Sequence, residues 1–168
     1  MQYGDFALWQ RSPEQQRRQE ESLEFWKQAL ANAPPVLDLP IDFPRRAPPT
    51  NSGMRPLRIT LGARDMTALR ALARAEGVST FVVVLSLMQA WLHRLSGQSH
   101  VVVGTTTSGR SLPQTDRMVG YFTNVLPLCA DLSGEPSLRA LLRQTQGVVA
   151  QVTAHQVLAL TQIMDTGL

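Results

Sequence analysis

The sequence predicts an α/β fold, a mixed sheet packed with helices. Apolar runs typical of strands occur at 101–103 and 121–132. A third segment, 57–61, alternates apolar and polar residues and indicates a half-exposed strand. Segments with apolar residues at helical spacing lie before, between and after these strands. Sheets usually have about five or six strands, so three strands indicate that part of an α/β domain is missing.

The composition is that of an ordinary globular protein with the length of one domain. The 168 residues are 43% apolar and 17% charged, with a net charge of +3 and scattered basic residues. No basic stripe with interleaved aromatics is present, so we do not expect nucleic-acid binding. No apolar run has the length of a membrane span, and no charged-then-apolar leader is present. We therefore expect a cytoplasmic protein without a membrane partner.

The first predicted helix begins at Ser12 and runs to about Leu30. Ser12 can cap its N-terminus, Pro13 suits the first helical position and Gln15 completes a capping box. The first half is polar and the second half carries apolar residues at helical spacing, so we expect it to be half solvated and half docked. Residues 1–11 show no clear helix start.

A connector rich in proline occupies residues 33–56. Its seven prolines remove hydrogen-bond donors and fix backbone angles, so no long regular element fits. A disordered interdomain linker is one interpretation, but five apolar residues favour an ordered connector. They are Val36, Leu37, Leu39, Ile41 and Phe43.

Two helices are predicted before the central strand. The first follows Gly62 and ends at Gly77. The second, 80–95, is nearly all apolar and has no Gly or Pro, which favours a buried helix, although 82–84 could also begin a strand. Its polar stripe faces a cavity, solvent or a satisfied core, and we favour the last two. The stripe consists of Ser86, Gln89 and His93.

The central stretch predicts a strand at 101–103, a turn or a close approach to a neighbour at Gly104, and a polar loop to Gly120. Ligands in an open α/β sheet gather where strands end, so this loop is a candidate site, although a plain surface connection is the commoner reading. One helical turn is expected at 115–119. In the strand that follows, Pro127 implies an edge or a bulge.

The C-terminal third predicts one long element. A turn at 133–136 leads into an amphipathic helix that begins near Leu138 and reaches at least Val152. Residues 157–168 are apolar and show no clear terminal element.

The sequence contains no complete catalytic set and no metal-binding pattern. Its histidines, 93, 100 and 155, stand in neither HxxxH nor HExxH spacing. GxSxG and Walker motifs are absent, and no carboxylate pair is placed for acid–base work. The single Cys129 excludes an internal disulfide and a cysteine-based metal site, and we expect a buried, inert thiol.

Five segments, in order, resemble motifs of the condensation domains of nonribosomal peptide synthetases. QYGDFALWQR at 2–11 resembles the segment that joins the family's two halves, and LEFWKQALANAPPVLDLPIDFPR at 23–45 resembles the helix and connector after it. STFVVVLSLMQAWLHRLSGQSHVVVGTTTSGR at 79–110 resembles the long helix, strand and glycine-arginine motif. MVGYFTNVLPLCADLSGEPSLRALL at 118–142 and AHQ at 154–156 are similar to the next two motifs.

The resemblance implies an incomplete chloramphenicol acetyltransferase-like half, from a fold of two α/β halves with a tunnel between them. Residues 1–56 would be the inter-half segment, helix and connector, and 57–168 the truncated core of the C-terminal half. The implied activity is that of an amide-forming acyltransferase of secondary-metabolite biosynthesis. No bound cofactor is implied, because both substrates arrive on the 4′-phosphopantetheine of donor and acceptor peptidyl carrier proteins.

Two departures from the family pattern indicate a fragment that is inactive alone. The HHxxxDG motif, which holds the family's active-site histidine, does not occur in the 168 residues. The final motif usually continues HQDxPFE, but this chain has HQVLALTQ from His155, to which we assign no chemistry. The missing N-terminal half is therefore an expected partner, and uncovered sheet edges predict self-association.

The resemblance assigns supporting residues and no catalytic one. Arg110 matches the arginine that pairs with the aspartate of HHxxxDG, a charge-assisted bond that would organise the active-site loop. Asn124 matches the asparagine of its motif and either bonds loop backbone near the tunnel or caps the strand end. Thr105, Thr107 and Ser108 are tunnel-lining candidates.

Alternative functions remain open. A non-catalytic or degenerate module that faces carrier proteins would show the same motifs, as would part of a related stand-alone acyltransferase. Thr123 stands where valine is usual and leaves epimerising subtypes open.

Overall fold

The computed structural model describes residues 2–42, 56–110 and 112–165. Both helices and strands occur in these ranges, as an α/β class requires, with four helices before the first strand. The elements are α1 (Tyr3–Gln10), α2 (Pro13–Ala29), α3 (Ala63–Glu76), α4 (Thr80–Ser96), β1 (His100–Thr107), η1 (Pro113–Thr115), β2 (Asn124–Asp131), α5 (Leu138–Ala154) and α6 (Leu160–Met164).

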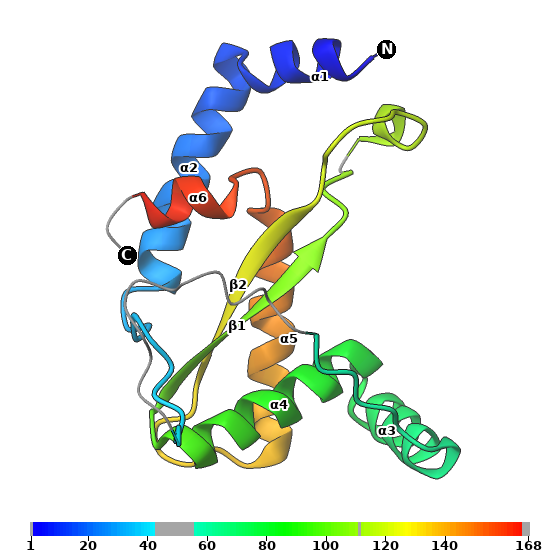
Figure 1. Cartoon of the computed structure of the whole chain (residues 1–168), viewed down its shortest axis with the longest axis vertical. Helices are drawn as coiled ribbons and strands as arrows, with labels where there is room; N and C mark the ends of the chain where they lie inside the picture. Colours follow the sequence, from blue (N-terminus) through cyan, green and yellow to red (C-terminus); the bar gives the residue numbers. More distant parts are fainter. Residues whose placement is uncertain (1, 43–55, 111, 166–168) are drawn as a thin grey trace.

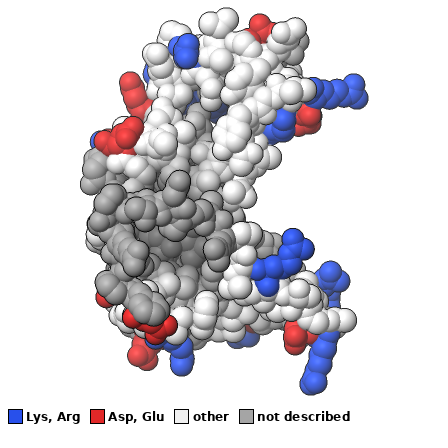
Figure 2. Space-filling model, viewed as in Figure 1, with Lys and Arg blue, Asp and Glu red and all other residues white. Residues whose placement is uncertain are grey.

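The two strands form an antiparallel ribbon at the centre of the molecule (Figure 1). Helix α5 packs against β2, α4 contacts both β1 and α5, and α3 packs on α4. At the other end, α1 and α2 extend beyond the ribbon, and α6 contacts β2. On the face shown in Figure 2 the outline of the molecule is hollowed on one side, and the charged side chains that are visible there are scattered rather than gathered by sign.

The ribbon pairs His100 with Asp131 at one end and Thr107 with Asn124 at the other. Strand β1 therefore continues through Gly104, where the sequence allowed a turn or a close approach to a neighbour, and the structure shows the close approach. The threonines after it lie in the strand rather than in a loop. Threonine favours pleated structure, and the missing Cβ of Gly104 leaves room for the Val125 side chain 3.3 Å from where a Cβ would lie.

The predicted strand at 57–61 is wrong. Residues 57–61 form no strand, and nothing in the described parts of the chain pairs with them. Leu57 is 85% exposed and Ile59 is 73% exposed, so the apolar side chains of this alternating segment do not pack against a core. The described sheet consequently has two strands instead of three and is antiparallel instead of mixed. Pro127 lies in a strand with one open edge, as expected.

Helix ends follow the local signals where these exist. The hydroxyls of Ser12, Ser79 and Ser137 each accept from the N–H three residues on, at 3.4, 3.2 and 3.3 Å. Gly77 and Gly97 close α3 and α4 in the left-handed conformation.

Two short helices were not predicted, and the predicted turn at 115–119 lies two residues earlier, at Pro113–Thr115. Helix α1 begins where the Gln2 N–H donates to the Asp5 carboxylate at 2.7 Å, a cap without Ser or Thr. Helix α6 has only five residues.

Trp26 is the centre of the main apolar core and is fully buried. Its indole N–H donates to the His155 carbonyl at 3.1 Å, which docks the second half of α2 onto the end of α5, as the polarity of that helix predicted. The described part of the connector is also ordered: Leu37 and Leu39 pack against the core. Val36 and Ile41 are exposed, and Phe43 lies outside the described residues.

Helix α4 buries Ser86 and Gln89, half-buries His93 and exposes much of its apolar surface, whereas the sequence favoured a buried helix. Gln89 is 1% exposed, and its amide donates to the Leu128 carbonyl at 3.0 Å. His93 Nδ1 lies 2.8 Å from the Gln98 carbonyl. The preferred satisfied-core interpretation thus holds for Gln89, whereas the buried Ser86 hydroxyl finds no partner among the described residues. Among the described residues no single helix is long and apolar enough to cross a membrane. Helices α3 and α4 have the required length and hydropathy only when taken together, and they are bent by 103° relative to each other.

Candidate functional site

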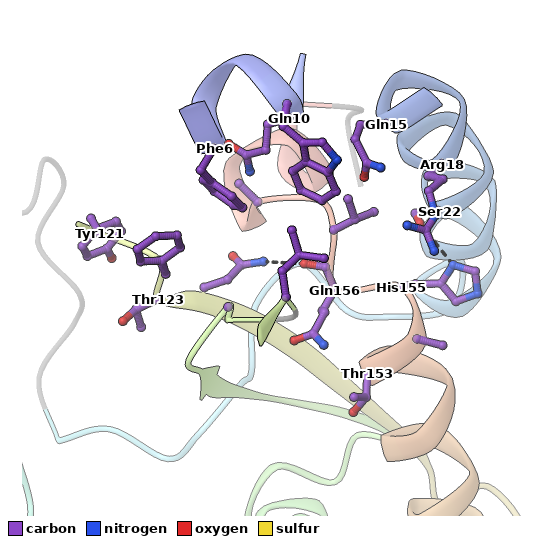
Figure 3. A pocket seen from close by; sticks show the side chains of 18 of the residues that line it. Phe6, Gln10, Gln15, Arg18, Ser22, Tyr121, Thr123, Thr153, His155 and Gln156 are labelled. Carbon is purple, nitrogen blue, oxygen red and sulfur yellow. Dashed lines mark hydrogen bonds between the residues drawn. The ribbon is translucent and has the colours of Figure 1, made fainter. Parts of the chain in front are cut away.

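A pocket of about 580 Å³ lies between α1, α2, the start of β2 and the turn after α5 (Figure 3). Four of the five motif segments noted in the sequence contribute to its lining. The lining residues from these segments are Tyr3, Phe6, Trp9, Gln10, Gly109, Tyr121, Phe122, Thr123, Asn124, Ala154, His155 and Gln156. The fold therefore gathers segments that are more than a hundred residues apart around one cavity.

Asn124 ties β2 to the turn that closes the pocket. Its amide donates to the carbonyls of Gln156, at 3.3 Å, and Leu158, at 2.6 Å. Its carbonyl oxygen accepts from Leu160 at 3.3 Å and from its neighbour Val125 at 2.9 Å. The side chain thus bonds loop backbone and also caps the strand end, so both interpretations of Asn124 describe its geometry.

An aromatic cluster forms the opposite wall. The Tyr3 hydroxyl donates to the Tyr121 carbonyl at 3.0 Å, and the Tyr3 ring meets Phe122 edge-on at 5.2 Å. Phe6 packs on Phe122 at 4.9 Å. A Cβ on Gly120 would lie 2.2 Å from the Tyr3 ring, so this wall requires glycine there.

Arg110 is bound to its own loop. Its guanidinium donates to the carbonyls of Thr115 and Met118, the latter at 3.0 Å, and lies 4.2 Å from the Phe122 ring centre. Gly109 beside it has φ +63°, and a Cβ there would lie 1.8 Å from the Phe122 carbonyl oxygen. Arg110 therefore holds the 112–118 loop next to the aromatic wall and does not point freely into solvent.

Helix α2 supplies polar groups that the sequence did not single out. Ser22 is buried, and its hydroxyl lies 3.2 Å from His155 Nδ1, while the His155 ring stacks on Phe25 at 4.1 Å. Figure 3 shows Ser22 and Arg18 on the α2 side of the cavity, near His155. Because α2 is strongly polar, the sequence does not distinguish these two pocket-lining residues from the solvated residues around them.

A second pocket, of about 370 Å³, adjoins the first. Thr105, Thr107 and Ser108 all line it, which brings the three tunnel-lining candidates together. Thr153 lines both pockets, and the Thr107 hydroxyl donates to the Gln156 side-chain carbonyl at 3.0 Å. A single hydrogen bond between side chains thus lies where the two cavities meet.

The lining of the site offers shape and hydrogen bonds. The described residues include no group of three or more His, Cys, Asp or Glu side chains that could hold a metal ion. Cys129 is half-buried, whereas a buried, inert thiol was expected. Burial, and then the nearby Asp131 carboxylate, raise the pKa of this thiol, which lowers its reactivity. The arrangement can enclose a ligand between an aromatic wall and a polar one.

Comparison with known proteins gives consistent matches. A family model described as "Condensation domain" matches residues 1–167. A linear gramicidin synthase of Brevibacillus parabrevis is 39% identical over 165 residues, 98% of this chain and 2% of that protein. Phosphinothricin tripeptide synthetase PhsC of Streptomyces viridochromogenes is 38% identical over 98% of this chain and 15% of that protein.

Among solved structures, holo-AB3403, a four-domain nonribosomal peptide synthetase bound to AMP and glycine, has a similar fold. The TM-score is 0.81 with 29% identity, over 90% of this chain and 12% of that one. The chain spans a small part of each of these three relatives.

Proposed function

The chain belongs to the condensation-domain family, and from that premise we propose that it forms one wall of a tunnel for peptide-bond formation. Its similarity to condensation-domain structures confirms the predicted chloramphenicol acetyltransferase-like fold class. Residues 1–56 would then join two halves of a domain, and residues 57–168 would belong to the second half.

The convergence of four motif segments on one cavity is the observation that carries this proposal. Residues near positions 3, 109, 122 and 155 share no local structure, yet all of them line the same pocket. Thr153 lines both pockets, and Thr105, Thr107 and Ser108 line the second. Two cavities that share a wall residue suit a long substrate arm better than a compact metabolite.

The proposed reaction joins two substrates that are each held as a thioester on the 4′-phosphopantetheine of a carrier protein. The amine of the acceptor attacks the donor carbonyl, a C–N bond forms, and the C–S bond breaks. The nitrogen loses a proton and the departing thiol gains one. In the family the HHxxxDG histidine handles protons, so this chain would bind and orient, and alone it would be inactive.

The residues of this chain would divide that work by position. Thr105, Thr107 and Ser108 offer hydroxyls to the amide groups of a pantetheine arm. Asn124 fixes the turn that closes the first pocket. Arg110 uses two of its five N–H donors on its own loop, so donors remain for the aspartate of an HHxxxDG motif. Arg110 is thus a positioning residue in this proposal.

The proposal is tested by supplying the absent half in trans. The 168-residue chain would be mixed with a polypeptide carrying the HHxxxDG half of a condensation domain, and with aminoacyl-loaded donor and acceptor carrier proteins. Dipeptidyl product, followed by mass spectrometry, should form only when both halves are present. Asn124→Ala should lower the yield, and the exposed Gln146→Ala on α5 should not.

A direct binding measurement separates failed assembly from a wrong assignment. An aminoacyl-pantetheine thioester should shift the NMR signals of Gln156 and Thr107 in the chain alone. Absence of those shifts, together with absence of product, would contradict the proposed tunnel. Shifts without product would favour the non-catalytic module instead.

A further inference from the structure

Gln15 on α2 is a buried amide that the fold of this chain leaves unpaired. Its side chain is 2% exposed and lines the larger pocket. Among the described residues neither its amide nitrogen nor its amide oxygen has a hydrogen-bond partner. The next glutamine, Gln16, differs, because its amide donates to the Arg11 carbonyl at 3.4 Å. Residues of this chain itself enclose Gln15, so its burial does not depend on what covers the outer surface.

The local role that the sequence predicted for the Gln15 side chain is not realised. In a complete capping box this side chain would accept from the Ser12 backbone N–H. That N–H donates to the Trp9 carbonyl at 3.0 Å instead, and the Gln15 backbone N–H alone bonds the Ser12 hydroxyl. Figure 3 shows the Gln15 side chain extending from α2 toward the cavity. The helix start therefore does not occupy the amide.

The position of the Gln15 amide makes the cavity its source of a partner. In the described part of the chain, the Ser86 hydroxyl is the one fully enclosed side-chain group without a hydrogen bond. The unpaired amide atoms of Gln15 therefore each keep an accessible edge, and the pocket that Gln15 lines is where that edge lies. Polar groups this deeply buried are normally hydrogen-bonded, so a ligand in the pocket is expected to complete the pairing.

The chemistry of the amide indicates which ligand group fits it. Gln15 offers an N–H donor and a carbonyl acceptor on the same side of a flat group. Another primary carboxamide has the same arrangement and satisfies both, whereas the N–H and C=O of a trans peptide unit point in opposite directions. A carboxylate would leave the Gln15 oxygen unpaired. An ammonium would leave the Gln15 N–H unpaired, and Arg18, one turn further along α2 in the same pocket, disfavours a second positive charge.

We propose that Gln15 selects an acyl group that ends in a primary carboxamide, such as an asparaginyl group, through a pair of hydrogen bonds in the larger pocket. The inference rests on the proposed function, in which the pantetheine arm lies in the second pocket beside Thr107 and Ser108. The acyl group at the end of that arm then reaches the first pocket, where Gln15 lies. Gln15 is thus a residue that determines substrate specificity.

Isothermal titration of the 168-residue chain with three pantetheine conjugates tests this assignment. The conjugates carry an asparaginyl, a leucyl or an aspartyl group, and a stable amide replaces the thioester. The three side chains have the same shape, but only the asparaginyl group offers both a donor and an acceptor. It should bind about tenfold more tightly than the other two, because a site that hydrogen-bonds a ligand group discriminates against the analogue without it.

Substitution of Gln15 should remove the preference. Gln15→Met keeps the length of the side chain without its polar groups, so it should bind the asparaginyl and leucyl conjugates equally. The matched control Gln16→Met should keep the preference. In the unaltered chain, the side-chain amide protons of Gln15 should show a nuclear Overhauser effect to the carboxamide of the bound asparaginyl group, a measurement that needs no variant.

Several results would overturn the inference. They include equal affinity of the wild-type chain for the asparaginyl and leucyl conjugates, a preference that survives Gln15→Met, and a preference lost in Gln16→Met. Equal weakening of both conjugates by Gln15→Met would assign the amide to the backbone of the acyl group instead. Loss of the preference on addition of an HHxxxDG half would assign Gln15 to a contact with that half.

The inference and the proposed function fail separately. If no conjugate binds, the proposed tunnel is wrong, and acetyl-asparagine methylamide, which has no pantetheine arm, then tests Gln15 by itself. It should shift the NMR signals of the Gln15 side chain, and acetyl-leucine methylamide should not. A chain that responds to neither compound, or to both alike, would contradict selection of a carboxamide.

Discussion

Removing the Asn124 side chain should loosen the turn that closes the larger pocket. Asn124→Ala deletes two hydrogen bonds to the Gln156 and Leu158 carbonyls and two from the N–H groups of Leu160 and Val125. A net hydrogen bond is worth about 1 kcal/mol, and a partner left half-buried and unpaired costs somewhat more. We therefore expect a loss of about 2–4 kcal/mol of unfolding free energy, which corresponds to roughly 4–16 °C in melting temperature for a chain of this size.

Asn124→Asp tests the same hydrogen bonds through the pH dependence of stability. The carboxylate would face the carbonyls that Asn124 now donates to, which raises its folded-state pKa above the ordinary value of about 3.9. A raised carboxyl pKa costs stability above that pKa, so the variant should be much weaker than wild type at pH 7 and should recover part of the difference near pH 4.

Urea unfolding and thermal unfolding at both pH values measure these losses, with Gln146→Ala as the matched control on an exposed helix face. A melting temperature of Asn124→Ala within a degree of wild type would refute the inference that Asn124 organises the turn. A deficit of Asn124→Asp that is equal at pH 4 and pH 7 would refute the role of its amide donors.

Four further predictions follow from single contacts. Gly109→Ala should unfold at lower denaturant concentration than wild type, because the left-handed backbone and the Phe122 carbonyl both exclude a Cβ. Ser86→Ala should raise stability by up to about 1 kcal/mol in the same assay, since it removes a buried hydroxyl without a described partner. Cys129 should react more slowly than free cysteine with a thiol reagent at pH 8, because its pKa is raised. Hydrogen bonds from Arg139 hold the pKa of Glu76 below 4.5, so the small stability difference between wild type and Glu76→Gln should be present at pH 7 and disappear as the pH falls through that lowered pKa.

Local chemistry made the long helices predictable. Each begins or ends at a residue whose side chain or backbone freedom acts within one turn, as Ser12, Ser137 and Gly77 do. Helix α1 was not predicted, because its N-terminus is capped by a hydrogen bond from the Gln2 backbone N–H to the Asp5 carboxylate. A cap of this kind has no distinctive sequence pattern.

Tertiary context decided the features that were predicted wrongly. The pattern of residues 57–61 is a strand pattern, but a strand exists only where another strand pairs with it. The apolar run of α4 favoured a buried helix, yet one apolar side of the helix is exposed while Gln89 is buried and donates to the Leu128 carbonyl on β2.

The candidate site was predictable in its members and not in its arrangement. The motif segments supplied Asn124 and the three tunnel-lining candidates, and the structure places these four around two adjoining cavities. Ser22 was missed, because which polar residues of α2 face inward depends on how Trp26 docks.

The indole of Trp26 has a mechanical consequence for the larger pocket. Because it joins the second half of α2 to the end of α5 through a buried contact, those two walls should move as one body. The opposite rim is held by an exposed hydrogen bond from Tyr3 to the Tyr121 carbonyl and by the packing of Phe6 on Phe122. Water can replace the hydrogen bond at little cost, but widening the cavity by a rotation of α1 about the Arg11–Ser12 junction also has to separate the two rings.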